Sequence, residues 1–448
     1  MSDTYPALRK ELGLRDLVLF NVAAIVSTRW IGAAAHVGSG TILLWVAAAI
    51  FFLAPSAFVV AHLSRMFPEE GGLYVWTREA FGEWHGFSCA WFYYLTNIFW
   101  LPGALVAPIG MMTYGFSRSA AELAENPRFV IPCALAVLTG IVASNYVGLR
   151  TAKWVDNLGA IGAYSIWIVI VFAALASSFK RGAASTFHLI PGMNLEKLNF
   201  WSQLALGMVG LELSPILAGE IHHARRTVFR ATWISALLVV IFYVFGTGAI
   251  LALLPPEQVS PVIGVAQASR QAAVTIGWSW VPVCVGFGIL FSLGGQLGTY
   301  IGGSARLPFV LGVDNLFPRA FARLHPKYGT PYIAILFLGV GAAVLLLLSQ
   351  LGETFRAAYQ ITVDMTVITQ FVPFLYLFAT AWKFGRKIAA ACGLVVSTIA
   401  IVFSFLPTGD VASIWLFEAK LAGGCVFVFA GARACYSHYR ARQTVAQP

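Results

Sequence analysis

The segment Val26-Ser-Thr-Arg-Trp-Ile-Gly-Ala-Ala-Ala35 places three polar residues, Ser27, Thr28 and Arg29, in the middle of an apolar run from about residue 17 to 38. About 20 apolar residues are enough for a helix to cross the roughly 30 Å hydrocarbon core of a bilayer. An arginine at the centre of such a helix costs roughly 2.5–3.5 kcal/mol on insertion scales and needs compensation. The segment therefore predicts a membrane span with a special function at its middle.

A second segment, Leu206-Gly-Met-Val-Gly-Leu-Glu-Leu-Ser-Pro215, has the same character. Gly207 and Gly210 weaken a helix, and Pro215 lacks the backbone N–H that a helix would use. Glu212 supplies a charge at the interruption. Transporters bind their cargo at such interruptions, where freed backbone groups and half-helix ends lie at mid-membrane. The two segments fall in the first and sixth apolar runs, which is the offset of a five-plus-five inverted repeat.

The composition excludes an ordinary soluble protein. Of the 448 residues, 59% are hydrophobic and 11% are charged, against about 45–50% and about 25% in globular domains. A bilayer solves this problem because lipid solvates the outer faces of the helices. We expect an all-α polytopic membrane protein with twelve spans, at about 17–38, 41–64, 84–116, 129–149, 155–178, 201–221, 228–254, 273–306, 331–350, 355–381, 386–406 and 411–436.

The distribution of basic residues predicts the orientation. Twenty of the 29 Lys and Arg residues fall in alternate segments that begin with the N-terminus, eight fall in the other segments, and Arg29 belongs to neither set. Cytoplasmic loops carry the excess of basic residues, so we expect both termini in the cytoplasm of a cell-membrane (inner or plasma membrane) protein. Topology also explains the net charge of +10, so we expect no nucleic-acid partner.

No water-soluble insertion interrupts the chain. We expect residues 1–448 to form one transmembrane domain, with spans one to ten in residues 1–381 and spans eleven and twelve with a cytoplasmic tail in residues 382–448. The six cysteines show no metal-ligand spacing, and the adjacent His222 and His223 have no third ligand nearby. No Walker-type motif is present, so we expect no direct use of ATP, and the sequence has no catalytic dyad or H-E-x-x-H signature. We therefore expect no metal, no cofactor and no enzymatic activity.

Several motifs resemble the amino acid–polyamine–organocation (APC) family of permeases. They are Phe67-Pro-Glu-Glu-Gly-Gly-Leu-Tyr-Val-Trp-Thr-Arg-Glu-Ala-Phe-Gly82 with Gly86-Phe87, Gly210-Leu-Glu212, Gly219-Glu220 through Arg225-Arg-Thr-Val-Phe-Arg230, and Ser304-Ala-Arg-Leu-Pro-Phe-Val-Leu-Gly-Val-Asp-Asn-Leu-Phe-Pro318 with His325-Pro-Lys-Tyr-Gly-Thr-Pro331. The resemblance implies a LeuT-type core of five plus five inverted-repeat helices, two further C-terminal helices and alternating access. It also implies that spans one, three, six, eight and ten line the substrate site.

The chain departs from the family pattern at three places. Members usually carry a glycine-rich stretch in span one, where this chain has Ser27-Thr28-Arg29; in this it is similar to some glutamate/γ-aminobutyrate exchangers of the family. Leu206 stands where many members have an aromatic gate. Gly162 and Ala163 stand where some members have a lysine that replaces a cation.

The candidate substrate-binding residues lie on the spans that the resemblance implies. Arg29 offers a planar fork that matches a carboxylate, or alternatively forms a permanent ion pair with a buried acid. Glu212 and Asp364 could receive an ammonium group or carry a proton, or could be structural. Ser292, Gln296 and Thr299 are cation-site candidates for which we favour a structural role. The full set of predicted substrate-binding residues is Ser27, Thr28, Arg29, Gly32, Tyr93, Leu206, Gly207, Gly210, Glu212 and Asp364.

The predicted function is secondary active transport of carboxylate-bearing amino acids, either coupled to protons or by exchange for a counter-substrate. One alternative is a polyamine or organic-amine permease, because two acids in the site would suit a substrate without a carboxylate. Another is a membrane sensor that binds its ligand on a permease scaffold without transporting it. The sequence leaves open whether the chain forms a homodimer.

Overall fold

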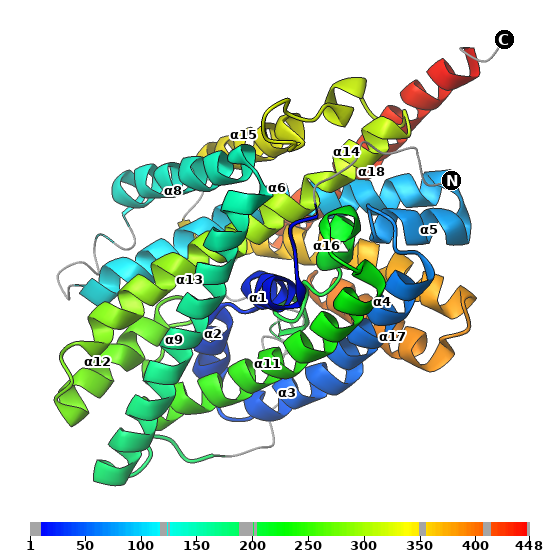
Figure 1. The fold of residues 1–448 in the computed structure, drawn as a ribbon. Coiled ribbons are helices and arrows are strands. Elements are labelled where there is room, and N and C mark those ends of the chain that lie inside the picture. The colour runs from blue at the N-terminus through cyan, green and yellow to red at the C-terminus, as the bar shows by residue number, and fades with distance from the viewer. Residues whose placement is uncertain are drawn as a thin grey trace.

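The computed structural model describes residues 10–116, 123, 126–187, 200, 204–348, 355–405 and 414–445. Helices account for nearly all regular structure in this part of the chain (Figure 1). Seven helices within it are long and apolar enough to cross a membrane, or eight if a bent pair counts as one span. The predicted ends of spans at 201–203, 349–350, 406 and 411–413 lie outside the described residues, as do Arg9, Arg118 and Lys197 from the charge analysis.

The first span is broken, as predicted. Helix α1 (Leu14–Ile25) ends before Val26, and helix α2 (Thr28–Val37) begins after Ser27. Val26 and Ser27 are both extended, and the two helix axes differ by 42°. The interruption therefore falls immediately before Arg29, where the polar residues interrupt the apolar run.

The sixth predicted span is also interrupted. Residues 204–206 are helical, the chain then leaves the α-helix at Gly207, and a 3₁₀ helix, η3, follows at Ser214–Glu220. Gly210 has φ +139°, a conformation that only glycine adopts readily. An added Cβ there would also stand 2.6 Å from Cγ1 of Ile25. A glycine at position 210 therefore lets the second interruption approach the first.

Most of the remaining helices follow the predicted apolar runs. The remaining helices are α3 (Thr41–Ala48), the π-helical η1 (Ala49–Leu53), α4 (Ala54–Met66), α5 (Leu73–Phe81), α6 (Glu83–Phe116), α8 (Pro127–Val147), α9 (Leu149–Arg181), α11 (Ala224–Leu253), η4 (Pro256–Gln258), α12 (Gly264–Ile276), α13 (Val281–Ser304), α14 (Arg306–Val313), η5 (Arg319–Ala322), α15 (Tyr332–Leu348), α16 (Phe355–Lys383), α17 (Lys387–Phe403) and α18 (Ile414–Val445). Of these, α5, η4, α14 and η5 lie between the predicted runs.

The eighth apolar run, 273–306, differs from its prediction. Its first residues belong to α12, which ends at Gly277 in the left-handed conformation. Pro282 then stands in the first turn of α13, a position where proline is favoured. The apolar pattern runs through this turn because apolar residues flank it on both sides, so hydropathy alone does not reveal it.

Small residues bring the central helices together. Gly159 of α9 faces Gly295 of α13, and a Cβ added to either would stand within 2.5 Å of the other's Cα. Such close contacts between backbones are how membrane helices associate without a hydrophobic driving force between them. In Figure 1, α1 and α2 lie in the middle of the molecule, with α9, α11, α13 and α16 around them. The two interruptions are therefore enclosed by complete helices.

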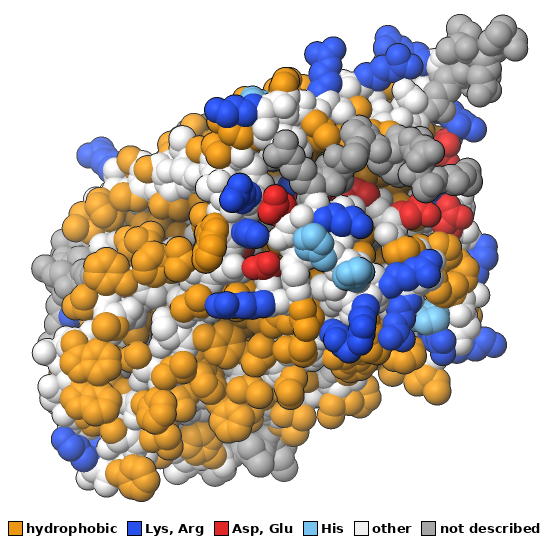
Figure 2. Space-filling model, viewed as in Figure 1, with side chains coloured by type: hydrophobic (Ala, Val, Ile, Leu, Met, Phe, Trp, Pro, Cys, Tyr) orange, Lys and Arg blue, Asp and Glu red, His pale blue; other side chains and the backbone are white. Residues whose placement is uncertain are grey.

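Charge and apolar surface are segregated. Figure 2 shows Lys, Arg and His side chains gathered toward the end of the molecule where α5, α14 and α18 lie in Figure 1, and a broad hydrophobic area over the rest of this face. We call this end the basic end. Exposed large apolar side chains such as Phe179, Leu237 and Phe287 are 90%, 64% and 51% exposed, which suits a surface in contact with lipid.

Candidate functional site

A small cavity lies where the two interruptions meet. Its volume is about 20 Å³, room for about one water molecule. It is enclosed by two residues of α1, one of α2, three of α6, two of the sixth predicted span, two of α13 and two of α16. These are Ala24, Ile25, Trp30, Thr96, Asn97, Trp100, Leu206, Val209, Gln296, Tyr300, Thr366 and Gln370. The cavity is thus in contact with all five spans that the family resemblance implies.

Tyr243 of α11 connects the two interruptions. Its hydroxyl oxygen lies 2.7 Å from the carbonyl oxygen of Ile25 and 2.8 Å from that of Gly207. It also accepts a hydrogen bond of 3.3 Å from the backbone N–H of Ser27. The phenol ring stacks on Trp45 with a centroid distance of 4.2 Å and an interplanar angle of 5°. One fixed hydroxyl therefore partners backbone groups that the broken helices leave open.

Glu212 is the centre of a buried polar cluster beside the cavity. Oε1 accepts hydrogen bonds from the Tyr93 hydroxyl at 2.9 Å and from the Gln370 side-chain amide at 3.4 Å. Oε2 accepts from the backbone N–H of Gly210 at 2.9 Å. Glu212 is 1% exposed. The cluster links α6, the sixth span and α16 through a single carboxyl group.

Arg29 packs against one of the residues that line the cavity. Its guanidinium carbon is 4.1 Å from the ring centroid of Trp30, within the range of a cation–π interaction. The residue is 6% exposed. Trp30 itself lines the cavity. The Trp30 side chain therefore contacts the guanidinium and also forms part of the cavity lining.

The other predicted residues take different places. Leu206 lines the cavity. Thr28 is the first residue of α2, and Gly207 packs against the Trp30 ring. Gly32 packs against the backbone of Gly264 in α12. Asp364 is fully buried in α16. Neither Arg29, Glu212 nor Asp364 is among the described residues that line the cavity.

Most of the lining consists of residues that the sequence analysis did not place in the site. Trp30, Trp100 and Tyr300 are aromatic, and Thr366 and Gln370 are neutral polar residues. One available signal was spacing. Asn97 follows Tyr93 by four residues, Tyr300 follows Gln296, and Gln370 follows Thr366 at the same interval. Residues four apart share a helix face, so each pair presents one polar face toward the centre of the bundle.

The chain is sealed on the basic-end side of this cavity. Leu12 and Ile221 form a parallel bridge, and the backbone N–H groups of Glu11 and Leu12 donate to the Glu220 carbonyl at 2.9 and 3.1 Å. The N–H of His222 donates to the Leu12 carbonyl at 3.0 Å. The segment before α1 is thereby joined to the end of η3.

A buried ion pair reinforces this seal. Nη2 of Arg306 lies 3.0 and 3.1 Å from the two carboxylate oxygens of Glu220, and the two residues are 2% and 4% exposed. Glu70, in the loop between α4 and α5, accepts a hydrogen bond of 2.6 Å from the N–H of Gly219. Burial, together with the nearby Glu220 carboxylate, raises the pKa of Glu70 well above its ordinary value. The seal therefore contains two buried acids and one buried arginine.

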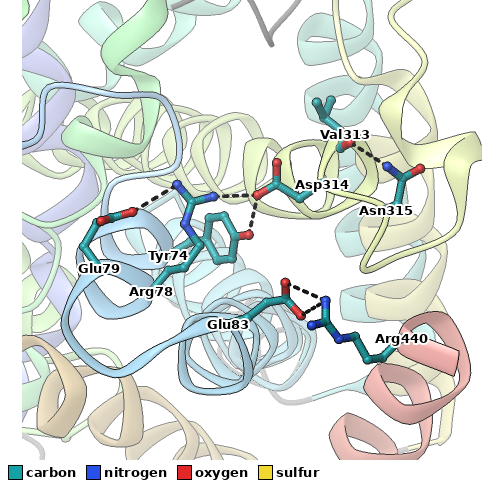
Figure 3. Close-up of polar contacts among 8 residues, drawn as sticks. All are labelled: Tyr74, Arg78, Glu79, Glu83, Val313, Asp314, Asn315 and Arg440. Atoms are coloured by element: carbon teal, nitrogen blue, oxygen red, sulfur yellow. Dashed lines mark hydrogen bonds and ion pairs between the residues drawn. The ribbon is translucent and has the colours of Figure 1, made fainter. Parts of the chain in front are cut away.

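Further polar contacts join helices at the basic end (Figure 3). Arg78 of α5 forms an ion pair of 2.8 Å with Asp314, which follows α14, and the Tyr74 hydroxyl donates to the same carboxylate. Glu83, the first residue of α6, forms an ion pair of 3.0 Å with Arg440 of α18. These contacts join helices that lie far apart in the sequence.

Comparison with known proteins identifies relatives of the whole chain. A family model described as amino acid permease matches residues 12–419. An uncharacterised transporter of Legionella pneumophila is 27% identical over 94% of this chain and 96% of its own length. The branched-chain amino acid permease BcaP of Bacillus subtilis is 26% identical over 78% of this chain and 76% of its own.

Two further matches are more distant. The probable agmatine/putrescine antiporter AguD of Lactococcus lactis is 20% identical over 94% of each chain. The crystal structure of MhsT in complex with L-phenylalanine superposes with a TM-score of 0.64 at 14% identity and covers 95% of this chain and all of that one. The structural match shows that this chain has the same overall fold as MhsT.

Proposed function

The chain belongs to the APC family of permeases, and from this premise we propose that it transports carboxylate-bearing amino acids, zwitterionic or acidic, by alternating access. That it is a multi-pass membrane transporter follows from the family match, the named transporters among its relatives and its apolar helices. The substrate and the driving force are the new elements of the proposal.

One observation carries the proposal: the two interrupted spans meet at a cavity inside the bundle and share one hydroxyl, that of Tyr243. A helix that unwinds inside a bilayer leaves polar backbone groups that must find partners. Polar groups inside a membrane cost free energy, and where they are kept they mark functional sites. Two interruptions at the same cavity support a substrate site at this point.

The small volume of the cavity supports alternating access. A space of about 20 Å³ does not hold an amino acid, so substrate binding requires the bundle to open. The bonded seal at the basic end leaves opening on the opposite side as the route from this conformation. We propose that the basic end is cytoplasmic, that the chain has twelve spans, and that the first ten form a five-plus-five inverted repeat as one domain with the last two.

The carboxylate would bind at the start of α2. The N-terminus of a helix presents free N–H groups and a partial positive charge, and Arg29 lies in the first turn of α2. Because Arg29 packs on Trp30 and does not itself line the cavity in this conformation, its guanidinium must move to reach a substrate. The hydroxyls of Ser27 and Thr28 would complete this pole of the site.

The ammonium group of the substrate would bind at the opposite side of the site, at the end of α1. The carbonyls at the end of α1, including that of Ile25, carry the partial negative charge of a helix C-terminus. The buried acids Glu212 and Asp364 would add formal charge and would carry a proton if transport is proton-coupled. Exchange for a second amino acid is the other driving force that this arrangement allows.

A polyamine or organic amine is the alternative cargo. Two buried acids, Glu212 and Asp364, favour it, and one relative is named as a probable agmatine/putrescine antiporter. Such a substrate lacks a carboxylate and would make no use of the Arg29 guanidinium. The two proposals therefore differ in what they expect of position 29.

The test is uptake and counterflow in proteoliposomes with glutamate, neutral amino acids and putrescine, for the natural chain and for Arg29→Ala. We expect flux of a carboxylate-bearing substrate and its selective loss in Arg29→Ala. Flux of putrescine alone, unchanged by the substitution, would establish the amine permease instead. Binding without any flux would identify a sensor built on the permease scaffold.

A further inference from the structure

Two adjoining hollows open at the basic end beside α1, away from the central cavity. The first has a volume of about 580 Å³ and is lined by basic residues at the start of α11. His223, Arg225, Arg226 and Arg230 form one wall, and Leu14 and Pro68 form the other. The three arginines are exposed. We call this hollow the basic pocket.

The second hollow is apolar and begins where the basic pocket ends. Its volume is about 500 Å³, and it shares Leu14 with the basic pocket. The rest of its lining is Arg15, Val18 and Leu19 of α1, Ile161 of α9 and Ile234 of α11. Ile161 and Ile234 are 50% and 43% exposed. We call this hollow the apolar groove.

The groove runs along the helices into the membrane. Ile234 lies ten residues into α11 and Ile161 twelve residues into α9, which is about 15 and about 18 Å of helix. Its walls are fixed, because Ser235 donates to the Val18 carbonyl at 3.4 Å and Asn157 donates to Asp16 at 3.2 Å. The groove thus lies beside the apolar parts of α9 and α11, where a lipid acyl chain would lie.

The charge of the basic pocket selects an anion. None of the described residues that line it is acidic. The nearest acids along the chain are Glu69, next to Pro68, and Asp16, whose carboxylate already accepts from Asn157 and from the N–H of Gly13. The pocket also lies at the N-terminus of the long helix α11, which favours negative charge.

We propose that the basic pocket and the apolar groove together bind one anionic phospholipid, with its headgroup phosphate among the arginines of α11 and an acyl chain between α1, α9 and α11. Basic pockets between helices on the cytoplasmic side of membrane proteins suit such headgroups. A soluble anion would use the basic pocket alone and would leave the apolar groove without a role. The proposal does not depend on which substrate is transported.

The test is native mass spectrometry of the purified full-length protein titrated with phosphatidylglycerol or phosphatidylcholine. We expect one phosphatidylglycerol molecule to be retained in preference to phosphatidylcholine. The triple variant Arg225→Ala, Arg226→Ala, Arg230→Ala should lose roughly 100-fold in phosphatidylglycerol affinity, since each basic side chain near an anionic surface contributes to binding. The matched control, Arg319→Ala, Arg323→Ala, Lys327→Ala, removes the same charge from exposed positions outside both hollows and should retain the lipid.

A second pair of variants tests the groove separately from the charge. Ile234→Trp fills the groove and should weaken retention at least about tenfold. Leu237→Trp, on the same helix at a residue that is 64% exposed and outside the groove, should not. Equal loss of lipid affinity in the two triple variants would reduce the effect to net charge and overturn the site. Inorganic phosphate that displaces the lipid fully, or retention unaffected by Ile234→Trp, would show a soluble-anion site instead.

Discussion

The hydroxyl oxygen of Tyr243 lies 2.7 Å from the carbonyl oxygen of Ile25, at the residue where the first span stops being helical. The same oxygen lies 2.8 Å from the carbonyl of Gly207 in the other interruption. A phenol has one proton to donate, so the two carbonyls share it. Tyr243 therefore fixes the distance between the two broken segments, and any movement of one past the other must break this arrangement.

We expect Tyr243→Phe to lower both stability and transport. The ring and its stacking on Trp45 remain, but buried carbonyls lose their donor, which costs about 1–3 kcal/mol. Thermal unfolding in detergent and initial uptake rates in proteoliposomes measure the two effects. The matched control is Tyr164→Phe, because Tyr164 donates to the Leu238 carbonyl at 2.7 Å, away from the cavity. A transport loss as large in the control as in Tyr243→Phe would refute the special role of Tyr243.

We expect Gly210→Ala to be strongly destabilising. Its φ of +139° and the 2.6 Å approach of an added Cβ to Ile25 impose backbone strain and overpacking of about 1–3 kcal/mol each. Gly140→Ala in α8 is the control, since a Cβ there meets nothing within 4 Å. The comparison requires only thermal unfolding of the two variants. Similar melting temperatures for Gly210→Ala and Gly140→Ala would show that position 210 tolerates a side chain. They would also show that the close approach of the two interruptions is not required for stability.

The fold was largely predictable because hydropathy and helix-breaking residues act locally. The polar residues Ser27 and Thr28 and the glycines before Glu212 marked both interruptions, and the structure confirms that the chain leaves the α-helix at each. The turn between α12 and α13 was not predicted because apolar residues lie on both sides of it. Hydropathy along the sequence does not distinguish one long apolar helix from two shorter ones.

The site was less predictable because it depends on contacts between distant parts of the chain. Charge drew attention to Arg29, Glu212 and Asp364, since a buried charge demands an explanation. The cavity itself is lined by aromatic and neutral polar residues such as Trp100 and Gln370. These are also common packing residues, and Tyr243 lies 218 residues from its partner Ile25. The role of Tyr243 could not be predicted because the sequence does not show which backbone groups its hydroxyl contacts.

We expect Glu212→Gln to abolish accumulation driven by an imposed pH gradient while leaving counterflow between equal pools. Glutamine cannot take up and release a proton. Its single side-chain oxygen also cannot serve both Tyr93 and the Gly210 N–H, so a moderate loss of stability should accompany the change. The control is Glu83→Gln, which alters an acid at the basic end that pairs with Arg440. We expect gradient-driven uptake in Glu212→Gln to be at least about tenfold lower than in this control. Undiminished accumulation would place the coupling proton elsewhere.

We expect Glu70 to make the seal at the basic end weaker as pH rises. Burial, and then the Glu220 carboxylate, raise the pKa of Glu70 well above its ordinary value, so the sealed state binds the proton more tightly than the open or unfolded state does. The penalty for ionising Glu70 is absent below the ordinary pKa of about 4.3 and grows as pH rises from there to the raised pKa. Melting temperatures between pH 5 and 8 should therefore fall with pH in the natural chain and fall less in Glu70→Gln, which keeps an acceptor for the Gly219 N–H. Glu69→Gln changes the exposed neighbouring acid and should follow the natural chain. A Glu70→Gln curve parallel to that of Glu69→Gln would mean that Glu70 is already ionised in the sealed state, with Arg306 balancing both carboxylates.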